Sequence, residues 1–221
     1  NSLQQIDGLL DVNADASGSS SIALGRNALA SQEGAIGIGN FGRASGAKSI
    51  AIGQESTAIG NTSISMGWNN TATGVNSISL GVNTRTSAAN SVGIGNYASY
   101  LGAFAATSSV MIGQDNGYAG GAQAVSIGYN CTSKASGGIA IGANARIDGS
   151  ANTNSIAIGA LSDALAVGAV ALGTGVQASK VATVSVTELE TQLAGGGITM
   201  KSPNGTEYKL TVSDAGALVI T

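Results

Sequence analysis

A five-residue motif recurs along most of the chain, and its spacing constrains the fold more than any other feature. One copy is Ser49-Ile50-Ala51-Ile52-Gly53, and ten variants repeat its alternation of small and aliphatic residues before a glycine. Seven of the ten intervals between closing glycines are 14 residues long. Self-similarity at a fixed period is typical of solenoid folds. The closing glycines are Gly25, Gly39, Gly53, Gly67, Gly81, Gly95, Gly113, Gly128, Gly142, Gly159 and Gly173.

Each repeat has the pattern of two short strands joined by two turns. Successive residues of Ser49–Ile52 alternate between small and aliphatic, which is the period of a β-strand. Gly53 then suits a turn that needs a positive φ. The third and fifth residues after it, Ser56 and Ala58, are small and flank the polar Thr57. The same alternation after most closing glycines predicts a second, shorter strand.

Two short strands and two tight turns use all fourteen residues, so the sequence predicts a flattened parallel β-roll. Stacked coils of such a roll lie ~4.8 Å apart. We expect Ile50 and Ile52 to point inward, against the small residues of the opposite strand. Ser49 and Ala51 would then form a flat outer face suited to close packing between copies. This predicts self-association, with a homotrimer as the favoured form, although the spacing alone does not count subunits.

Composition excludes several classes of function. Charged residues make up 10% of the chain and the net charge is −3, so no basic stripe is available for nucleic acid. The chain has no histidine and a single cysteine, Cys131, which we expect to be a small buried residue of the roll. We therefore predict no metal site, no cofactor and no enzymatic activity. No apolar run approaches the ~20 residues that span a bilayer, so we expect no membrane insertion within this chain.

The repeated motif resembles the head repeats of trimeric adhesins of the Yersinia-adhesin type. The resemblance covers Ser21 to Lys180. It implies a left-handed parallel β-roll, three copies of which associate into a head. The predicted fold is accordingly all-β, with an N-terminal lead-in over residues 1–18 and the roll over residues 19–180.

Two further segments are predicted after the repeats. Over residues 181–197, Val186, Leu189 and Leu193 have helical spacing, and Ser185 with Glu188 resembles a capping box. This short helical neck is similar in position to the neck of the adhesin family. Residues 198–221 alternate as strands around turn signals and predict a small β-meander. This last piece also resembles C-terminal parts of phage tail and virion proteins.

Departures from the fourteen-residue period indicate where loops leave the roll. Four extra residues lie between Gly95 and Gly113, one between Gly113 and Gly128, and three between Gly142 and Gly159. Insertions in a solenoid project outward and often carry binding residues. Aromatic rings, which suit sugar faces or protein anchors, gather in this region. The predicted ligand-binding residues are Tyr97, Tyr100, Phe104, Tyr118 and Tyr129, with Trp68 as a weaker candidate; alternatively, the bulge packs a small satellite cluster on the roll.

The sequence predicts a non-enzymatic trimeric surface protein that attaches through several identical weak sites. Its partner would be a host cell-surface polysaccharide or protein. The first hypothesis is a phage fibre or surface protein located on the virion. The second is the head domain of a bacterial trimeric autotransporter adhesin on the cell surface. The third is a purely structural capsid or tail decoration protein.

Overall fold

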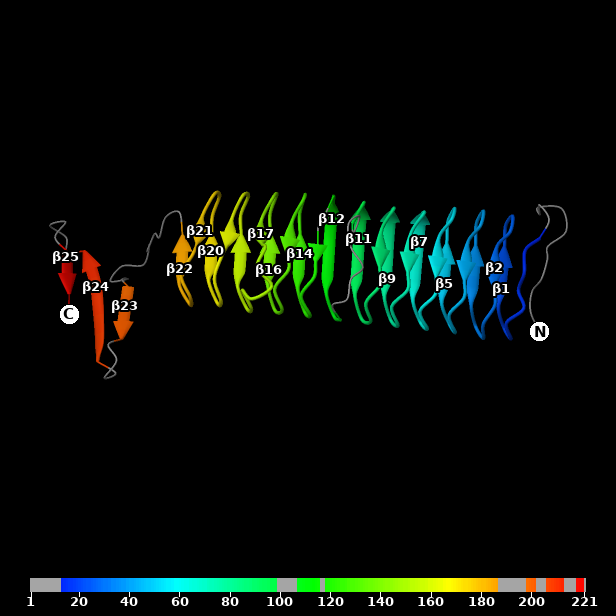
Figure 1. Ribbon diagram of the computed structural model, residues 1–221, viewed down its shortest axis with the longest axis horizontal. Coiled ribbons are helices and arrows are strands. Elements are labelled where there is room, and N and C mark those ends of the chain that lie inside the picture. The colour runs from blue at the N-terminus through cyan, green and yellow to red at the C-terminus, as the bar shows by residue number, and fades with distance from the viewer. Residues whose placement is uncertain are drawn as a thin grey trace. The chain divides into compact units, whose positions relative to one another are not determined.

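The computed structural model describes residues 13–98, 107–115, 118–186, 198–201, 206–212 and 218–220. The chain divides into two compact units, residues 1–187 and 188–221, which are described separately below. The first unit is the predicted β-roll, in which successive coils stack along one direction (Figure 1). We name each coil by its closing glycine.

One side of the roll, the first wall, is a parallel sheet of twelve strands with one strand per coil. Strands pair one repeat apart, so that Ile50 lies between Ile36 and Ile64. The strands are β1 (Ile22–Leu24), β3 (Ile36–Ile38), β5 (Ile50–Ile52), β7 (Ile64–Trp68), β9 (Ile78–Val82), β11 (Val92–Asn96), β12 (Val110–Gln114), β14 (Val125–Ile127), β16 (Ile139–Ile141), β18 (Ile156–Ile158), β20 (Val170–Leu172) and β22 (Val184–Val186).

The opposite side, the second wall, consists of two-residue strands in two parallel sheets. The break between the sheets falls at the predicted insertion between Gly95 and Gly113. Residues 99–106 of that insertion lie outside the described residues. The first sheet contains β2 (Leu29–Ala30), β4 (Arg43–Ala44), β6 (Thr57–Ala58), β8 (Thr71–Ala72) and β10 (Arg85–Thr86). The second contains β13 (Tyr118–Ala119), β15 (Thr132–Ser133), β17 (Arg146–Ile147), β19 (Asp163–Ala164) and β21 (Gln177–Ala178).

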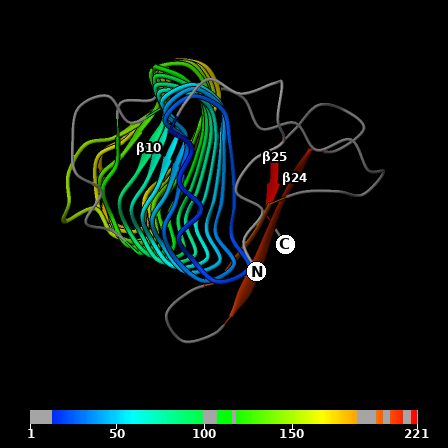
Figure 2. The ribbon, with the colours of Figure 1, turned by 90° about the vertical axis from the view of Figure 1, so that its right-hand side faces the viewer.

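The predicted orientation of the first wall is wrong. Ser49 and Ala51 are fully buried between the walls, whereas Ile50 and Ile52 are partly exposed on the outer face. The two walls face each other across a narrow interior (Figure 2). Alanine and serine side chains from both walls fill that interior, for example Ala51 and Ala58, leaving no room for two columns of isoleucine. The face available for association is therefore aliphatic, not the small-residue face.

Hydrogen bonds explain why serine so often opens the motif. The Ser49 hydroxyl donates to the Gly46 carbonyl oxygen over 2.7 Å, and both groups lie inside the roll. Ser21 and Ser77 make the equivalent bond to the residue three positions earlier. A buried polar group without a partner is destabilising, so the serine satisfies a carbonyl of the turn that precedes its strand.

The turn after each first-wall strand, the first turn, depends on the closing glycine. All eleven closing glycines have φ between 117° and 140°. A Cβ added to Gly67 would lie 1.9 Å from the Gly81 carbonyl oxygen of the next coil. The residue two positions later also has positive φ in most coils, and it is often asparagine, as at Asn69 and Asn83. Glycine at the closing position is therefore a steric requirement of coil stacking.

Both ends of the roll extend beyond their predicted limits. At the N-terminal end Asp15 bridges to Leu29 and Ala16 is buried, so the roll begins before residue 19. At the other end Val184–Val186 forms β22, which pairs with β20. The helical neck predicted over 181–197 is thus wrong for these three residues, because they extend the first wall. Residues 187–197 lie outside the described residues, and the described part of the chain contains no helix.

The second unit contains the predicted β-meander. β23 (Ile198–Lys201) pairs with β24 (Glu207–Val212), which pairs with β25 (Leu218–Ile220), and both pairings are antiparallel. The alternating segments assigned from the sequence are therefore confirmed as strands.

We predict that Gly67→Ala destabilises the roll far more than Gly175→Ala. The first substitution places a methyl group against backbone of the next coil, which we expect to cost more than about 3 kcal/mol. Gly175 also has a positive φ, of 69°, but a Cβ there meets nothing within 4 Å. Its substitution should cost about 1 kcal/mol for the left-handed backbone alone. Urea unfolding of the two variants measures the difference, and equal losses would contradict the steric explanation.

Candidate functional site

Charged side chains are concentrated on the second wall and its turns. Arg43, Arg85 and Arg146 open three of its short strands and are exposed, while the outer positions of the first wall carry no charged residue. The second wall is therefore the polar exterior of the roll.

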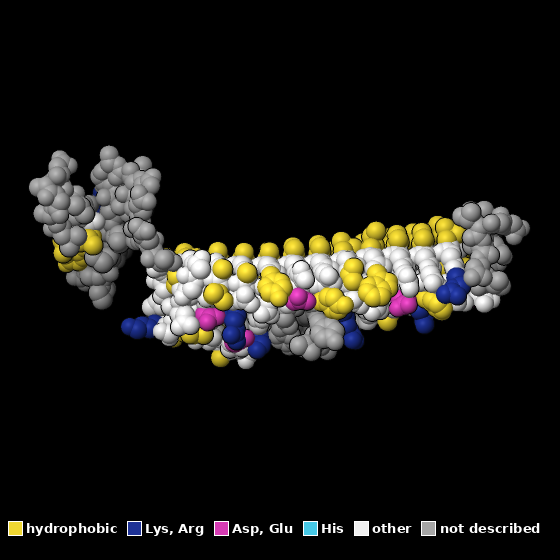
Figure 3. Space-filling view, turned by 90° about the horizontal axis from the view of Figure 1, so that it is seen from above, with side chains coloured by type: hydrophobic (Ala, Val, Ile, Leu, Met, Phe, Trp, Pro, Cys, Tyr) yellow, Lys and Arg dark blue, Asp and Glu magenta, His cyan; other side chains and the backbone are white. Residues whose placement is uncertain are grey.

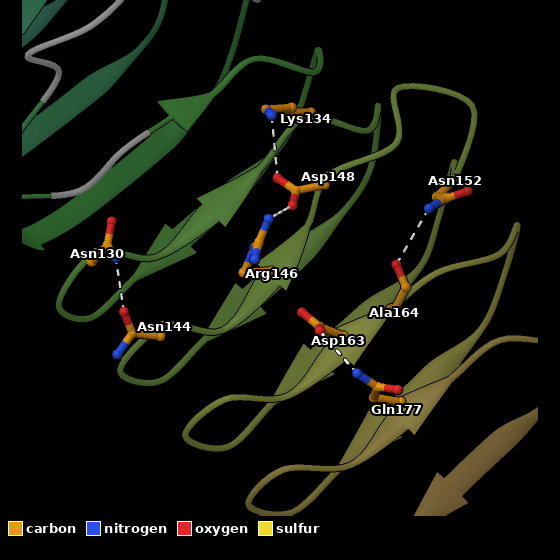
Figure 4. Close-up of polar contacts among 9 residues, drawn as sticks. All are labelled: Asn130, Lys134, Asn144, Arg146, Asp148, Asn152, Asp163, Ala164 and Gln177. Atoms are coloured by element: carbon orange, nitrogen blue, oxygen red, sulfur yellow. Dashed lines mark hydrogen bonds and ion pairs between the residues drawn. The ribbon is translucent and has the colours of Figure 1, made fainter.

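A shallow groove of about 600 Å³ crosses the outer side of β15, β17 and β19 (Figure 4). Its lining is polar apart from one leucine. Neighbouring coils are linked across it by side chains, as where the Asn130 amide donates to Asn144 over 2.8 Å. The lining residues are Asn130, Thr132, Lys134, Asn144, Arg146, Asp148, Leu161 and Asp163.

The charges in this groove compensate one another. Asp148 accepts from Arg146 and forms an ion pair with Lys134 at 3.2 Å. Asp163 supplies a second carboxylate, which accepts from the Gln177 amide over 3.4 Å. With two cations and two carboxylates, the groove does not present a basic surface for an acidic polymer. Arg146, one of the three exposed arginines of the second wall, is thus paired with a carboxylate of its own coil.

The three-residue insertion between Gly142 and Gly159 follows Asp148, which lines this groove. Gly149 accepts a backbone hydrogen bond from Asn152 over 3.0 Å, and the Asn152 amide reaches the Ala164 carbonyl oxygen over 3.3 Å. Ile147 and Ser155 on either side remain buried in the regular positions. The extra residues therefore leave the roll as a surface turn without disturbing its interior, as predicted for an insertion.

A smaller concavity of about 340 Å³ lies in the N-terminal half of the roll, lined by Phe41, Arg43, Glu55 and Thr57. The Arg26 guanidinium stands 5.3 Å from the centre of the Phe41 ring. An exposed cation beside an aromatic face contributes modestly to stability and fixes the ring's position. Phe41 was not among the residues selected from the sequence.

Groups that could support catalysis or metal binding are scarce in the described residues. Within them, no three His, Cys, Asp or Glu side chains gather into a possible metal site. Cys131 is fully buried, as expected, and burial raises the pKa of its thiol. A neutral, inaccessible thiol is a poor nucleophile. The described residues also include no helix long and apolar enough to cross a membrane.

The structure describes some of the predicted ligand-binding aromatics and not others. Trp68, Tyr97 and Tyr129 are exposed at the first turn, with 46%, 37% and 51% of their surface accessible. Tyr118 contributes its backbone to β13, and its side chain lies outside the described residues, as do Tyr100 and Phe104 entirely. Phe41, which occupies the same turn position as Tyr97, could have been found by comparing positions between repeats.

The repeats match the sequence model of one protein family. A sequence model of the YadA head domain repeat, which spans two copies, matches residues 16–41, 44–70, 72–98, 119–145 and 151–175. These segments make up more than half of the chain. The chain belongs to the YadA head domain repeat family. The YadA match is interrupted after residue 98 and after residue 145, where the insertions leave the regular coil.

A comparison with solved structures finds a crystal structure of the collagen-binding domain of the Yersinia adhesin YadA. The two sequences are 24% identical, and the alignment covers 97% of this chain and 88% of that one, with a TM-score of 0.32. No curated protein sequence matches the chain. The family assignment therefore rests on the repeat match.

We predict that Asp148→Asn lowers the free energy of unfolding by less than about 1 kcal/mol, since solvent-exposed ion pairs contribute little. The side chains of Lys134, Arg146 and Asp148 are 43%, 54% and 33% exposed. The variant should nevertheless bind an immobilised anionic polymer at low salt more strongly than the wild type, because two cations lose their counter-charge. Urea unfolding and a salt-elution profile test both expectations. A loss of several kcal/mol would show instead that the ion pairs hold the second wall together.

Proposed function

We propose that the chain is the head region of a non-enzymatic trimeric adhesin on a bacterial cell surface. Its outward surfaces would attach to a host polysaccharide or protein. The observation that carries the proposal is the outer face of the first wall, which is aliphatic at the first and third position of every strand and is partly exposed among the described residues.

This aliphatic face is continuous along the roll. The first and third residues of every first-wall strand point outward, and all of them are isoleucine, leucine, valine or methionine. They include Met66 at 40% and Ile158 at 39% exposure. Figure 3 shows hydrophobic side chains following one another along one edge of the roll, with the charged groups lying away from it. A soluble protein rarely leaves an apolar surface of this extent in water, so the face needs a partner.

A second copy of the same face is the partner that the surface fits. The face is flat, uncharged and built from one repeating unit, so it is complementary in shape and chemistry to itself. The resemblance to trimeric adhesins supports three copies around one axis. Such an arrangement turns the three second walls outward, and three identical weak sites then act together through avidity.

The comparisons favour the adhesin hypothesis over the virion fibre, which neither of them supports. The resemblance of the C-terminal meander to phage proteins stays unconfirmed. A purely structural role differs from the adhesin in predicting no attachment at all. Binding of the intact protein to cultured host cells, compared with a heat-unfolded sample, separates the two, and absence of binding would favour the structural role.

We predict that Ile64→Lys breaks the assembly, whereas Thr71→Lys does not. Both positions are outward and partly exposed, on the first and second walls respectively. A lysine within the aliphatic face would place like charges together at the three-fold axis, away from water. Sedimentation equilibrium should give a trimer for the wild type and for Thr71→Lys, and a monomer or an aggregate for Ile64→Lys. A wild-type monomer would refute the proposed assembly.

A further inference from the structure

Large exposed hydrophobic side chains on the first turn occur in every second coil. Four of the five are aromatic and the fifth is a leucine, and we call them together the aromatic row. They are Phe41, Trp68, Tyr97, Tyr129 and Leu161, in the coils of Gly39, Gly67, Gly95, Gly128 and Gly159. Each is between 37% and 58% exposed, and each occupies the first or second position after its closing glycine. The two-coil interval is kept even where insertions change the number of residues between members.

Backbone hydrogen bonds fix the spacing of the row. Asn83 donates to the Trp68 carbonyl, and Tyr97 donates to the Val82 carbonyl, each over 2.9 Å. The same turn-to-turn bonds continue past the first insertion, where Asp115 donates to the Asn96 carbonyl over 3.0 Å. Since stacked coils lie ~4.8 Å apart, successive members of the row stand roughly 9.6 Å apart along the roll.

The coils between the row's members carry mainly hydrogen-bonding groups at the same turn. These are Gln54 with Glu55, Val82 with Asn83, Gln114 with Asp115, and Ala143 with Asn144. Amides also stand beside the row's members, at Asn40, Asn69, Asn96 and Asn130, so the feature that alternates along the edge is the large apolar group. Figure 3 shows this side of the roll, with hydrophobic groups standing separately among polar ones and apart from the continuous aliphatic line.

Backbone strain at three of the five members indicates that their bulky side chains are not a product of folding alone. Phe41, Tyr97 and Leu161 have φ of 56°, 51° and 59°, in the left-handed region. Asparagine, which tolerates that region, occupies the equivalent position in several other coils. Bulky side chains at positive φ are uncommon and disfavoured. Strained residues of this kind tend to cluster at functional sites, where another requirement outweighs their cost.

We propose that the aromatic row binds a linear, neutral polysaccharide lying along the roll. The length of one sugar in an extended β-linked chain is close to the separation of two adjacent coils, so every second sugar meets a ring. The apolar face of the sugar stacks on a ring or, at Leu161, packs on the leucine side chain. The carboxylates of Glu55 and Asp115 accept hydrogen bonds from the hydroxyl groups, whereas the amide oxygens of Asn83 and Asn144 already accept from asparagines of the preceding coils. Glu55 and Asp115 would repel an anionic polymer. This inference rests on the proposed attachment function and specifies its ligand.

An extended peptide has a similar repeat, since a polyproline II helix advances ~9.3 Å per turn. Its prolines, however, have no N–H to donate. The carboxylates of Glu55 and Asp115 are acceptors only, so the hydroxyl-rich ligand matches the row better.

The length of the ligand provides the first test. Soluble β-1,4-linked oligomers of glucose and of N-acetylglucosamine are titrated into the full chain by calorimetry. Affinity should rise in steps of two sugars, because only every second added sugar reaches a new ring. Affinity that rises smoothly, an oligogalacturonate that binds as tightly, or a proline-rich peptide that binds in place of the sugars would overturn the proposal.

Substitutions provide the second test. Trp68→Ala and Tyr129→Ala should each weaken binding about tenfold, or about 1.4 kcal/mol, while Tyr208→Ala should not. Tyr208 is comparably exposed, at 42%, but belongs to the other unit. Tyr97→Asn should weaken binding and raise the thermal midpoint, since it removes a ring and relieves strain at once. Unchanged affinity in all three row variants would refute the inference.

The same variants distinguish this inference from the proposed attachment. If Trp68→Ala weakens oligosaccharide binding about tenfold but leaves cell attachment intact, the row binds a sugar that is not the receptor. If the wild type attaches to cells but binds none of the oligosaccharides, the row inference fails and attachment stands. If it binds the oligosaccharides but no host cell, the attachment function fails.

Discussion

The hydrogen-bonded register between successive coils is the constraint on which the rest of the structure depends. Each residue of the first wall pairs with the equivalent residue of the next coil, as Ile50 does with Ile64. A side chain therefore has its own equivalents as its nearest neighbours on both sides. One choice of residue, repeated in every coil, becomes a column along the whole roll. The small interior, the aliphatic face and the glycine turn are three such columns.

The same register explains why insertions are tolerated and glycine replacements are not. Extra residues between Gly142 and Gly159 leave through a surface turn, and the strands on either side resume the shared register. A methyl group on a closing glycine cannot be accommodated in this way, because it clashes with backbone atoms of the adjacent coil. The steric requirement at the closing glycines thus sets the coil geometry, while the number of residues between two of them can vary.

Much of the fold could be predicted from the sequence, because the period, the turns and the C-terminal strands are local signals. Which side chains of the first wall face the interior could not be predicted. A strand of alternating small and aliphatic residues can turn either set toward the interior, and the usual assumption places isoleucine inside. The outcome is decided by the distance between the walls, which admits Ala51 and Ala58 but not Ile50 and Ile52. Similarly, Phe41 and Leu161 belong with Tyr97 only when positions are compared between coils. Along the sequence itself, the visible pattern is the cluster of aromatic residues around the insertions.

Apolar side chains meet solvent in two arrangements on this roll, and the difference between them separates assembly from recognition. On the first wall they repeat in every coil without interruption, so that only another flat apolar surface can cover them all. At the first turn they occur in every second coil with polar groups between, and a flat apolar partner would leave Glu55 and Asp115 desolvated and unpaired. The first arrangement therefore suits a copy of the roll, and the second suits a partner that is itself periodic and alternates between apolar faces and hydrogen-bond donors.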